Sequence, residues 1–219
     1  MNVSPATRKG HRAGISPANA GRRYPAEILT PDEARALLAA CSRRAPTGIR
    51  NRALLVVLYR AGLRVSEALA LRPKDVDPTG GTILVLHGKE DRARTVGLDD
   101  GAFAVVAHWL ERRRALGLSG RQPLFCTLDG RPLKSSYVRT LLPRLALKAG
   151  IEKRVHAHGL RHTHAAELAA EGKPVNLIQA QLGHASLATT DRYLRHIAPR
   201  ELVTAMQSRT WSPEASSLT

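Results

Sequence analysis

The chain has 219 residues, of which 43% are hydrophobic, enough for a folded core and too many for a disordered protein. Its 34 Lys and Arg residues against 18 Asp and Glu give a formal net charge of +16, which favours a polyanionic partner such as nucleic acid. From charge alone, a basic protein that is ribosome-associated or simply soluble is the alternative. The sequence has neither an apolar run near the roughly 20 residues of a membrane helix nor a secretory signal at its start, so we expect a cytoplasmic protein that does not bind membranes.

Residues 1–24 are rich in Gly, Ala, Pro and Arg and have no hydrophobic period. This composition predicts a basic, disordered arm able to lie along nucleic acid, with an ordinary leader segment as the alternative. The first helix is expected at Thr30, because Thr30 can cap it, Pro31 suits the first helical position and Glu33 completes a capping box. The apolar run over residues 53–59 is either a buried helix or a strand, which periodicity alone does not distinguish.

The middle of the chain predicts a small β-sheet. Residues 82–87 and 92–98 are typical of two strands joined by a short charged turn, which gives a hairpin with Lys89 near its tip. Residues 125–127 are expected to form a short third strand.

The remaining pattern is helical. Helices are expected to begin at residue 99 or 100, at residue 135 or 136, and after residue 156, where helical periodicity continues to about residue 208 with breaks at 172–174 and near 183. Pro143 lies inside one of these helices and is expected to kink it. The fold class is therefore α+β, mainly α-helical with a small antiparallel β-sheet, in one domain over residues 25–208 followed by a disordered tail at 209–219.

Three separated segments carry the chemically informative residues. The first reads GLRVSEAL at residues 62–69, and the second reads HGLRHT at residues 158–163. The third reads LGH at residues 182–184 and is followed nine residues later by Tyr193. Each residue alone could be an ordinary surface or packed side chain without a catalytic role. Their occurrence together, in this order, is not expected of unrelated surface residues.

In these segments the sequence closely resembles the tyrosine recombinases, which include the phage integrases and the Xer-type resolvases. Their catalytic pattern is an Arg in a GLRxSE-like box, a Lys on a β-hairpin, an HxxR pair, and LGH followed by a Tyr. Over residues 25–200 the resemblance points, position by position, to a catalytic set in this chain: Arg64, Lys89, His158, Arg161, His184 and Tyr193. The position of the lysine in such hairpins varies along the strand, and Arg92 and Arg94 are cations close to Lys89 that compete with it for this assignment.

The resemblance implies a reaction in which Tyr193 attacks a DNA phosphate and forms a 3′-phosphotyrosine, without ATP, metal or cofactor. Arginine side chains suit this chemistry because they stabilise the charge that develops on the phosphate oxygens. Arg64 and Arg161 are expected to do so, with His184 donating to a non-bridging oxygen and His158 as base or orienting group. The resemblance assigns protonation of the leaving 5′-oxygen to Lys89. Glu67, three residues after Arg64, is expected to orient that arginine.

The implied partner is double-stranded DNA in a bacterial or phage-encoded, nucleoid-associated system. We expect a monomer in solution and a homotetramer on synapsed DNA, with Leu202 and Met206 on a C-terminal helix that either docks into a neighbouring subunit or packs on its own. Family members usually carry a helical core-binding domain before the catalytic one, and the sequence preceding Thr30 is too short for it. This chain is therefore expected to be a minimal recombinase, a fragment, or a protein that acts with an accessory DNA-binding partner.

Three other interpretations stay open. A nicking and closing activity like that of type IB topoisomerases shares the same chemistry, and a catalytically idle DNA-binding regulator derived from a recombinase shares the same fold. The histidines of residues 156–164 also invite a metal site, but the segment lacks the Glu of a zinc-protease helix and Arg161 would repel a cation. Cys41 and Cys126 are far apart and predict neither a zinc knuckle nor a disulfide framework.

Overall fold

The computed structural model describes residues 27–86, 93–183 and 206–207. The predicted arm at 1–24 and the predicted tail at 209–219 lie outside these residues. The elements in chain order are α1 (Pro31–Ala39), α2 (Pro46–Arg60), α3 (Val65–Ala70), the 3₁₀ helix η2 (Pro73–Asp75), β1 (Val76–Asp77), β2 (Thr82–Val85), β3 (Arg94–Gly97), α4 (Asp100–Ala115), α5 (Ser135–Lys148), α6 (Ala157–Ala170) and α7 (Val175–Leu182).

The predicted fold class is confirmed, because helices dominate and the sheet is small and antiparallel, with strand order β1-β2-β3. In the predicted hairpin, Thr82 pairs with Gly97 and Val85 with Arg94. The expected third strand at 125–127 is wrong: the third strand is β1, and Cys126 forms only an isolated bridge with Pro132. A tight turn closes directly after Cys126, which leaves no room for a longer ladder.

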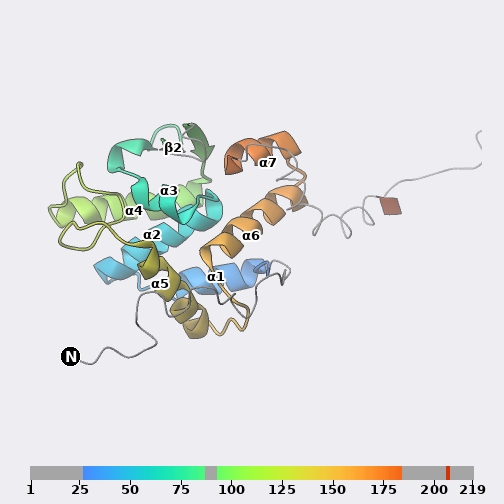
Figure 1. Ribbon diagram of the computed structural model, residues 1–219, viewed down its shortest axis with the longest axis horizontal. Coiled ribbons are helices and arrows are strands. Elements are labelled where there is room, and N and C mark those ends of the chain that lie inside the picture. Colours follow the sequence, from blue (N-terminus) through green and yellow to red (C-terminus); the bar gives the residue numbers. More distant parts are fainter. Residues whose placement is uncertain (1–26, 87–92, 184–205, 208–219) are drawn as a thin grey trace, which may run out of the picture.

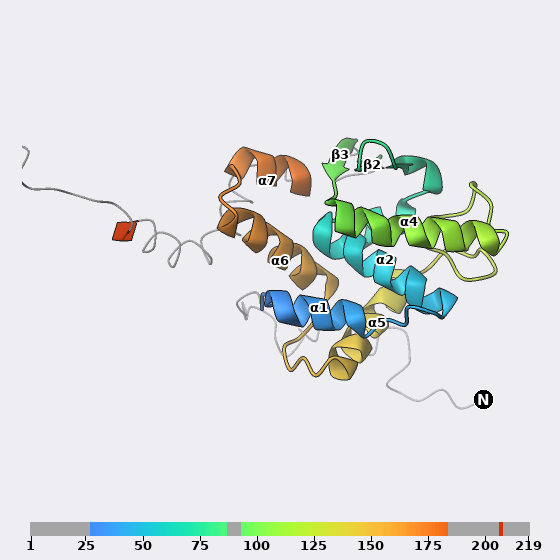
Figure 2. The ribbon, with the colours of Figure 1, turned by 180° about the vertical axis from the view of Figure 1, so that it is seen from behind.

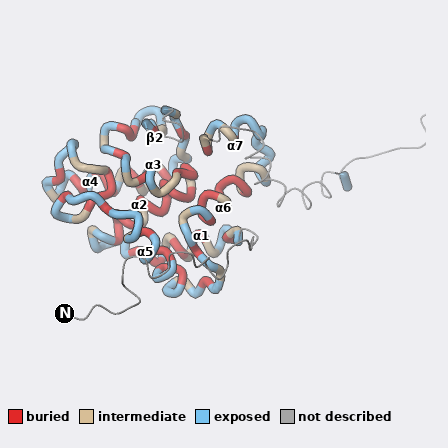
Figure 3. Tube along the Cα trace, viewed as in Figure 1, coloured by how far each residue is buried: buried red, intermediate tan, exposed pale blue. Residues whose placement is uncertain are grey.

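Helix α2 is the centre of the molecule, with α4 running alongside it and α6 crossing its other side (Figures 1 and 2). The ambiguous run 53–59 belongs to this helix, which starts at Pro46, and Leu54, Leu55 and Leu58 are fully buried. Figure 3 shows buried residues along nearly the whole of α2 and on the inward faces of the surrounding helices. A helix that is apolar on almost all sides is buried on almost all sides, which explains why its sequence lacks a clear period.

The helix starts follow local capping chemistry. Thr30 and Glu33 form the predicted capping box of α1, with the Thr30 backbone N–H 2.7 Å from the Glu33 carboxylate. Asp99 caps α4 by accepting a 2.9 Å hydrogen bond from the Ala102 backbone N–H. Helix α5 begins at Ser135 and continues through Pro143. Helices α6 and α7 are separated by the break predicted at 172–174, and no described helix has the length and apolar character needed to cross a membrane.

Candidate active site

The first motif segment forms the turn between α2 and α3. Gly62 has a φ of +62°, and a Cβ at this position would lie 2.7 Å from the ring of His164 and 2.9 Å from Leu182. Glycine is required here both for its backbone conformation and for the close approach of two side chains. The turn buries Leu63 and places Arg64 at the N-terminal end of α3, where its side chain is 31% exposed.

The carboxylate of Glu67 lies beneath Arg64 and is almost completely buried. It accepts a 2.9 Å hydrogen bond from the Arg64 backbone N–H and a 2.6 Å hydrogen bond from Arg64 Nη1. Arg94 on β3 donates to the same carboxylate through Nη1 at 3.0 Å and Nη2 at 2.9 Å. Burial opposes ionisation of Glu67, but the hydrogen bonds from Arg94 and from the Arg64 backbone outweigh it and hold the pKa of Glu67 below its ordinary value. Glu67 is thus an ionised anchor shared by two guanidinium groups.

Arg161 lies on α6 and is 1% exposed. Its Nη1 donates to the carbonyl oxygen of Gly62 and its Nη2 to that of Leu182, each at 2.5 Å. The side chain therefore joins the turn before α3 to the last residue of α7. Arg64 is the more exposed of the two arginines in the predicted catalytic set, while Arg161 is committed to two backbone carbonyls.

His158 lies one helical turn before Arg161 on α6 and is exposed. Its ring packs edge-on against that of His162, with centroids 4.4 Å apart. Partial burial, and then the positive charges of Arg161, His156 and Arg64, lower the pKa of His158 from its ordinary value. The imidazole is accordingly neutral at pH 7 and able to accept a proton.

The other histidines of the segment have different surroundings. His156 caps α6, with its Nδ1 accepting a 3.0 Å hydrogen bond from the Gly159 backbone N–H. His164 is buried, 4% exposed, behind the Gly62 turn. No group of three potential metal ligands is found in the described parts of the chain.

The end of α7 completes the cluster. Gly183 has a φ of +63°, and a Cβ there would lie 2.6 Å from Nε of Arg94. Its carbonyl oxygen accepts a long, 3.4 Å hydrogen bond from Nη2 of Arg64. The side chain of Gln181 fixes this end to the sheet, because its amide donates to the Gly97 carbonyl at 3.0 Å and accepts from the Gly97 N–H at 3.1 Å.

The structure thus gathers four of the residues singled out in the sequence: Arg64, Glu67, His158 and Arg161. Three further predicted residues, Lys89, His184 and Tyr193, lie outside the described residues. The sequence patterns do not reveal the contributions of Gln181 and Arg94, and they mark Arg94 only as a cation close to Lys89. The partner of Arg94 is 27 residues distant in the chain, and no local pattern marks such a pair.

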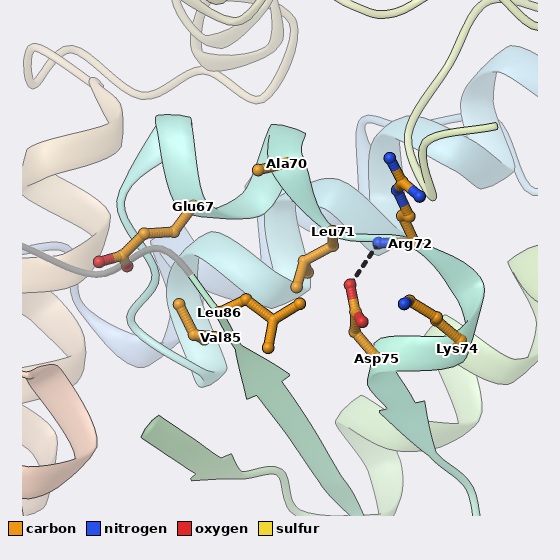
Figure 4. Close-up of a pocket in the computed structure, with 8 residues that line it drawn as sticks. All are labelled: Glu67, Ala70, Leu71, Arg72, Lys74, Asp75, Val85 and Leu86. Atoms are coloured by element: carbon orange, nitrogen blue, oxygen red, sulfur yellow. Dashed lines mark hydrogen bonds between the residues drawn. The ribbon is translucent and has the colours of Figure 1, made fainter. Parts of the chain in front are cut away.

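A cavity of about 440 Å³ adjoins this cluster between α3, η2 and β2 (Figure 4). Glu67 stands at one end, and Arg72, Lys74 and Asp75 stand at the other, with apolar side chains such as Leu71 between them. The Asp75 carboxylate accepts a 2.8 Å hydrogen bond from the Arg72 backbone N–H. Asp75 therefore stabilises the local turn, and Glu67 is the residue that the cavity shares with the arginine cluster.

Similarity to known proteins agrees with this arrangement. The curated tyrosine recombinase XerC of Xanthomonas axonopodis pv. citri (strain 306) is 36% identical over 181 residues, which cover 83% of this chain and 57% of that protein. XerD of the same strain is 36% identical over 192 residues, covering 82% of this chain and 61% of that protein. The chain therefore spans little more than half the length of these relatives.

Two solved structures extend the comparison to the fold. The crystal structure of XerA recombinase has 32% sequence identity and a TM-score of 0.75, covering 89% of this chain and 70% of that one. XerH site-specific recombinase bound to palindromic difH substrate, in a post-cleavage complex, has 30% identity and a TM-score of 0.70, covering 84% and 53% of the two chains. The model of the phage integrase family matches residues 27–200, and this chain belongs to that family.

Proposed function

We propose that this chain is the catalytic domain of a site-specific DNA recombinase that cleaves and rejoins DNA through a 3′-phosphotyrosyl intermediate at Tyr193, without metal or ATP. The observation that carries the proposal is the meeting of three distant segments: Arg64 from the first, His158 and Arg161 from the second, and the Leu182–Gly183 end of the third. Family membership and the similarity to XerC and XerD support the same activity.

The described residues have the properties that phosphoryl transfer requires. Arg64 is partly exposed and fixed by an ionised carboxylate, so its guanidinium is preorganised for a phosphate oxygen. Arg161 adds its charge beside His158 and holds both flanking turns in place. Preorganised cations of this kind stabilise the charge on the transferring phosphoryl group.

The nucleophile and its proton transfers complete the proposed mechanism. A free tyrosine has a pKa near 10, so forming the phenolate at pH 7 costs about 4 kcal/mol. The arginines lower that cost, and the neutral imidazole of His158 serves as base or orienting group. His184 donates to a non-bridging oxygen, and Lys89 protonates the leaving 5′-oxygen. Attack by a 5′-hydroxyl on the phosphotyrosine then reseals the strand without ATP.

Double-stranded DNA is the proposed partner. The net charge of +16 suits a phosphate backbone, and XerH is known in complex with its difH substrate. Assembly is proposed as a monomer in solution that forms a homotetramer on synapsed DNA, alone or with an accessory DNA-binding protein.

The test uses nicked suicide duplexes made from DNA that flanks the gene, incubated with the protein in EDTA. We expect a covalent protein–DNA adduct on denaturing gels that is absent with Tyr193→Phe. Strand exchange between two duplexes distinguishes a recombinase from a nicking and closing enzyme, which relaxes supercoiled DNA without a second duplex. Tight DNA binding without an adduct on any fragment would favour the idle regulator instead.

A further inference from the structure

Arg94 uses every nitrogen of its guanidinium within the candidate site. Nη1 and Nη2 bind the two oxygens of the Glu67 carboxylate at 3.0 and 2.9 Å, and Nε donates a longer, 3.4 Å hydrogen bond to the carbonyl oxygen of Gln181. The side chain is only 13% exposed. Each of the three guanidinium nitrogens therefore has a protein partner, and the side chain is mostly buried, which leaves Arg94 poorly placed to bind a phosphate itself.

We infer that Arg94 is a positioning residue, which acts on the DNA phosphate through Glu67 and Arg64; this inference rests on the proposed function. Glu67 receives its described hydrogen bonds from two residues only, Arg64 and Arg94. Its side chain is 2% exposed, so the loss of a donor leaves a buried carboxylate with fewer hydrogen bonds, which is costly for a charged group. Removing Arg94 takes away two of the four described donors to the Glu67 carboxylate. The carboxylate that fixes the Arg64 guanidinium is then free to move.

The same guanidinium occupies the space over Gly183. A Cβ at Gly183 would lie 2.6 Å from Nε and 2.7 Å from Cζ of Arg94, so the guanidinium lies directly against the backbone at the end of α7. Through these contacts the side chain of Arg94 on β3 holds the start of α3 and the end of α7 in position relative to each other. Arg94 thereby links the strand that follows the predicted hairpin loop to two of the three motif segments.

The inference is tested with Arg94→Gln and Arg94→Lys in the full chain, with Arg114→Ala as the control. Arg114 is an exposed arginine near the end of α4, and its substitution removes the same charge away from the site. The measurements are the rate of covalent adduct formation at saturating DNA, the salt dependence of DNA binding, and the NMR signals of the Arg64 guanidinium in the DNA-free protein.

For Arg94→Gln we expect the rate of adduct formation to fall about 100-fold, as for a misplaced catalytic group, and the Arg64 guanidinium signals to be lost through exchange. The slope of log K against log salt should stay at the wild-type value, whereas a lost phosphate contact would reduce it by about 0.9. Arg94→Lys restores one ion pair to Glu67 but not the fork, so its rate should recover to about tenfold below wild type. Arg114→Ala should keep the wild-type rate.

A Glu67→Gln background separates positioning from direct contact. If Arg94 acts through Glu67, adding Arg94→Gln to Glu67→Gln should lower the rate by less than about threefold, because the shared carboxylate is already gone. A further 100-fold loss in that background, or a reduced salt slope, would show that Arg94 meets the DNA directly and would overturn the inference. Unchanged Arg64 signals in Arg94→Gln would overturn it as well. A wild-type protein that forms no adduct would count against the proposed function, and the NMR comparison would still decide the role of Arg94.

Discussion

Arg161 and Gly62 are joined by a 2.5 Å hydrogen bond from the guanidinium to a backbone carbonyl oxygen, although they lie 99 residues apart in the chain. The other terminal nitrogen of Arg161 binds the carbonyl oxygen of Leu182. Because the side chain is buried, these contacts replace water that the two carbonyl groups would otherwise bind. Arg161 consequently has a structural task in addition to the catalytic one proposed for it.

Arg161→Lys is expected to lower both stability and activity. Lysine keeps the charge but cannot span two carbonyl groups in the fixed geometry of a guanidinium, so one buried carbonyl loses its donor at a cost of roughly 1–3 kcal/mol. Urea unfolding measures the stability, and the suicide-duplex assay measures the adduct. Arg113→Lys is the matched control, because Arg113 is 2% exposed and also binds backbone carbonyls, at residues 118–123. It should lose similar stability while folded molecules keep the wild-type rate; equal loss of activity in both variants would remove the case for Arg161 in the site.

The pH dependence of adduct formation tests the role of His158. Burial and the charges of Arg161, His156 and Arg64 place its pKa below the ordinary 6.5. A lowered pKa means that the imidazole is protonated only at lower pH, so the rate should begin to fall at a lower pH than it would with an unperturbed histidine as the base. His158→Asn is expected to be slow and to lack this acidic limb. An acidic limb that persists unchanged in His158→Asn would assign it to another group.

Local patterns in the sequence predict most of the helices and the β-hairpin. The features that they do not predict depend on contacts between residues far apart in the chain. Thr30 and Glu33 are three residues apart, so the capping box of α1 is legible in the chain. The start of α2 was missed because Arg50 and Asn51 look like surface residues. Both are buried, and Arg50 binds the Cys126 carbonyl and the Tyr137 hydroxyl, 76 and 87 residues away.

The candidate site divides in the same way. Arg64, His158 and Arg161 were recognised because their motifs are contiguous and characteristic of a family. Arg94 occupies an ordinary strand position in the sequence. Its role in the site comes from contacts with Glu67 on α3 and Gly183 after α7, which only the folded structure brings together. Two residues also form the strand β1, which is too short for an alternating pattern to be recognised.

Buried His164 makes the fold sensitive to acid. Burial, followed by the charges of Arg60 and Arg161, lowers its pKa to about 4, and neither ring nitrogen has a hydrogen-bond partner within the described residues. The unfolded chain takes up a proton near pH 6.5 and the folded protein does not, so stability falls as pH drops below 6.5 and levels off only below the folded pKa. At about 1.4 kcal/mol per pH unit, this amounts to about 2 kcal/mol between pH 7.5 and 5.

His164→Leu should remove this part of the pH dependence in urea unfolding. The exposed His108 on α4 provides the control, and His108→Gln should leave the pH dependence as in wild type. The difference between wild type and His164→Leu isolates the buried histidine from His156 and His158, whose pKa values are also lowered. Parallel stability curves for wild type and His164→Leu would contradict the assignment.

Gly183→Ala should be more damaging than the loss of a glycine alone, and Gly117→Ala provides the comparison. Both glycines have a positive φ, +63° and +71°, but a Cβ at Gly117 would meet no atom within 4 Å, whereas one at Gly183 would meet Arg94 at 2.6 Å. The left-handed backbone conformation costs an alanine about 1–2 kcal/mol at either position. Only Gly183→Ala must also displace the guanidinium that anchors Glu67.

We therefore expect Gly117→Ala to lose about 1–2 kcal/mol in urea unfolding and to form the adduct at the wild-type rate per folded molecule. Gly183→Ala should lose more stability and slow adduct formation by about 10- to 100-fold, in line with a displaced catalytic arginine. Combining it with Arg94→Ala should cost less stability than the sum of the two single losses, because the smaller side chain leaves space for the new Cβ. Equal stability losses for the two alanine variants would mean that Arg94 moves aside at no cost, and the close packing of β3 against the end of α7 would then have no part in holding the site together.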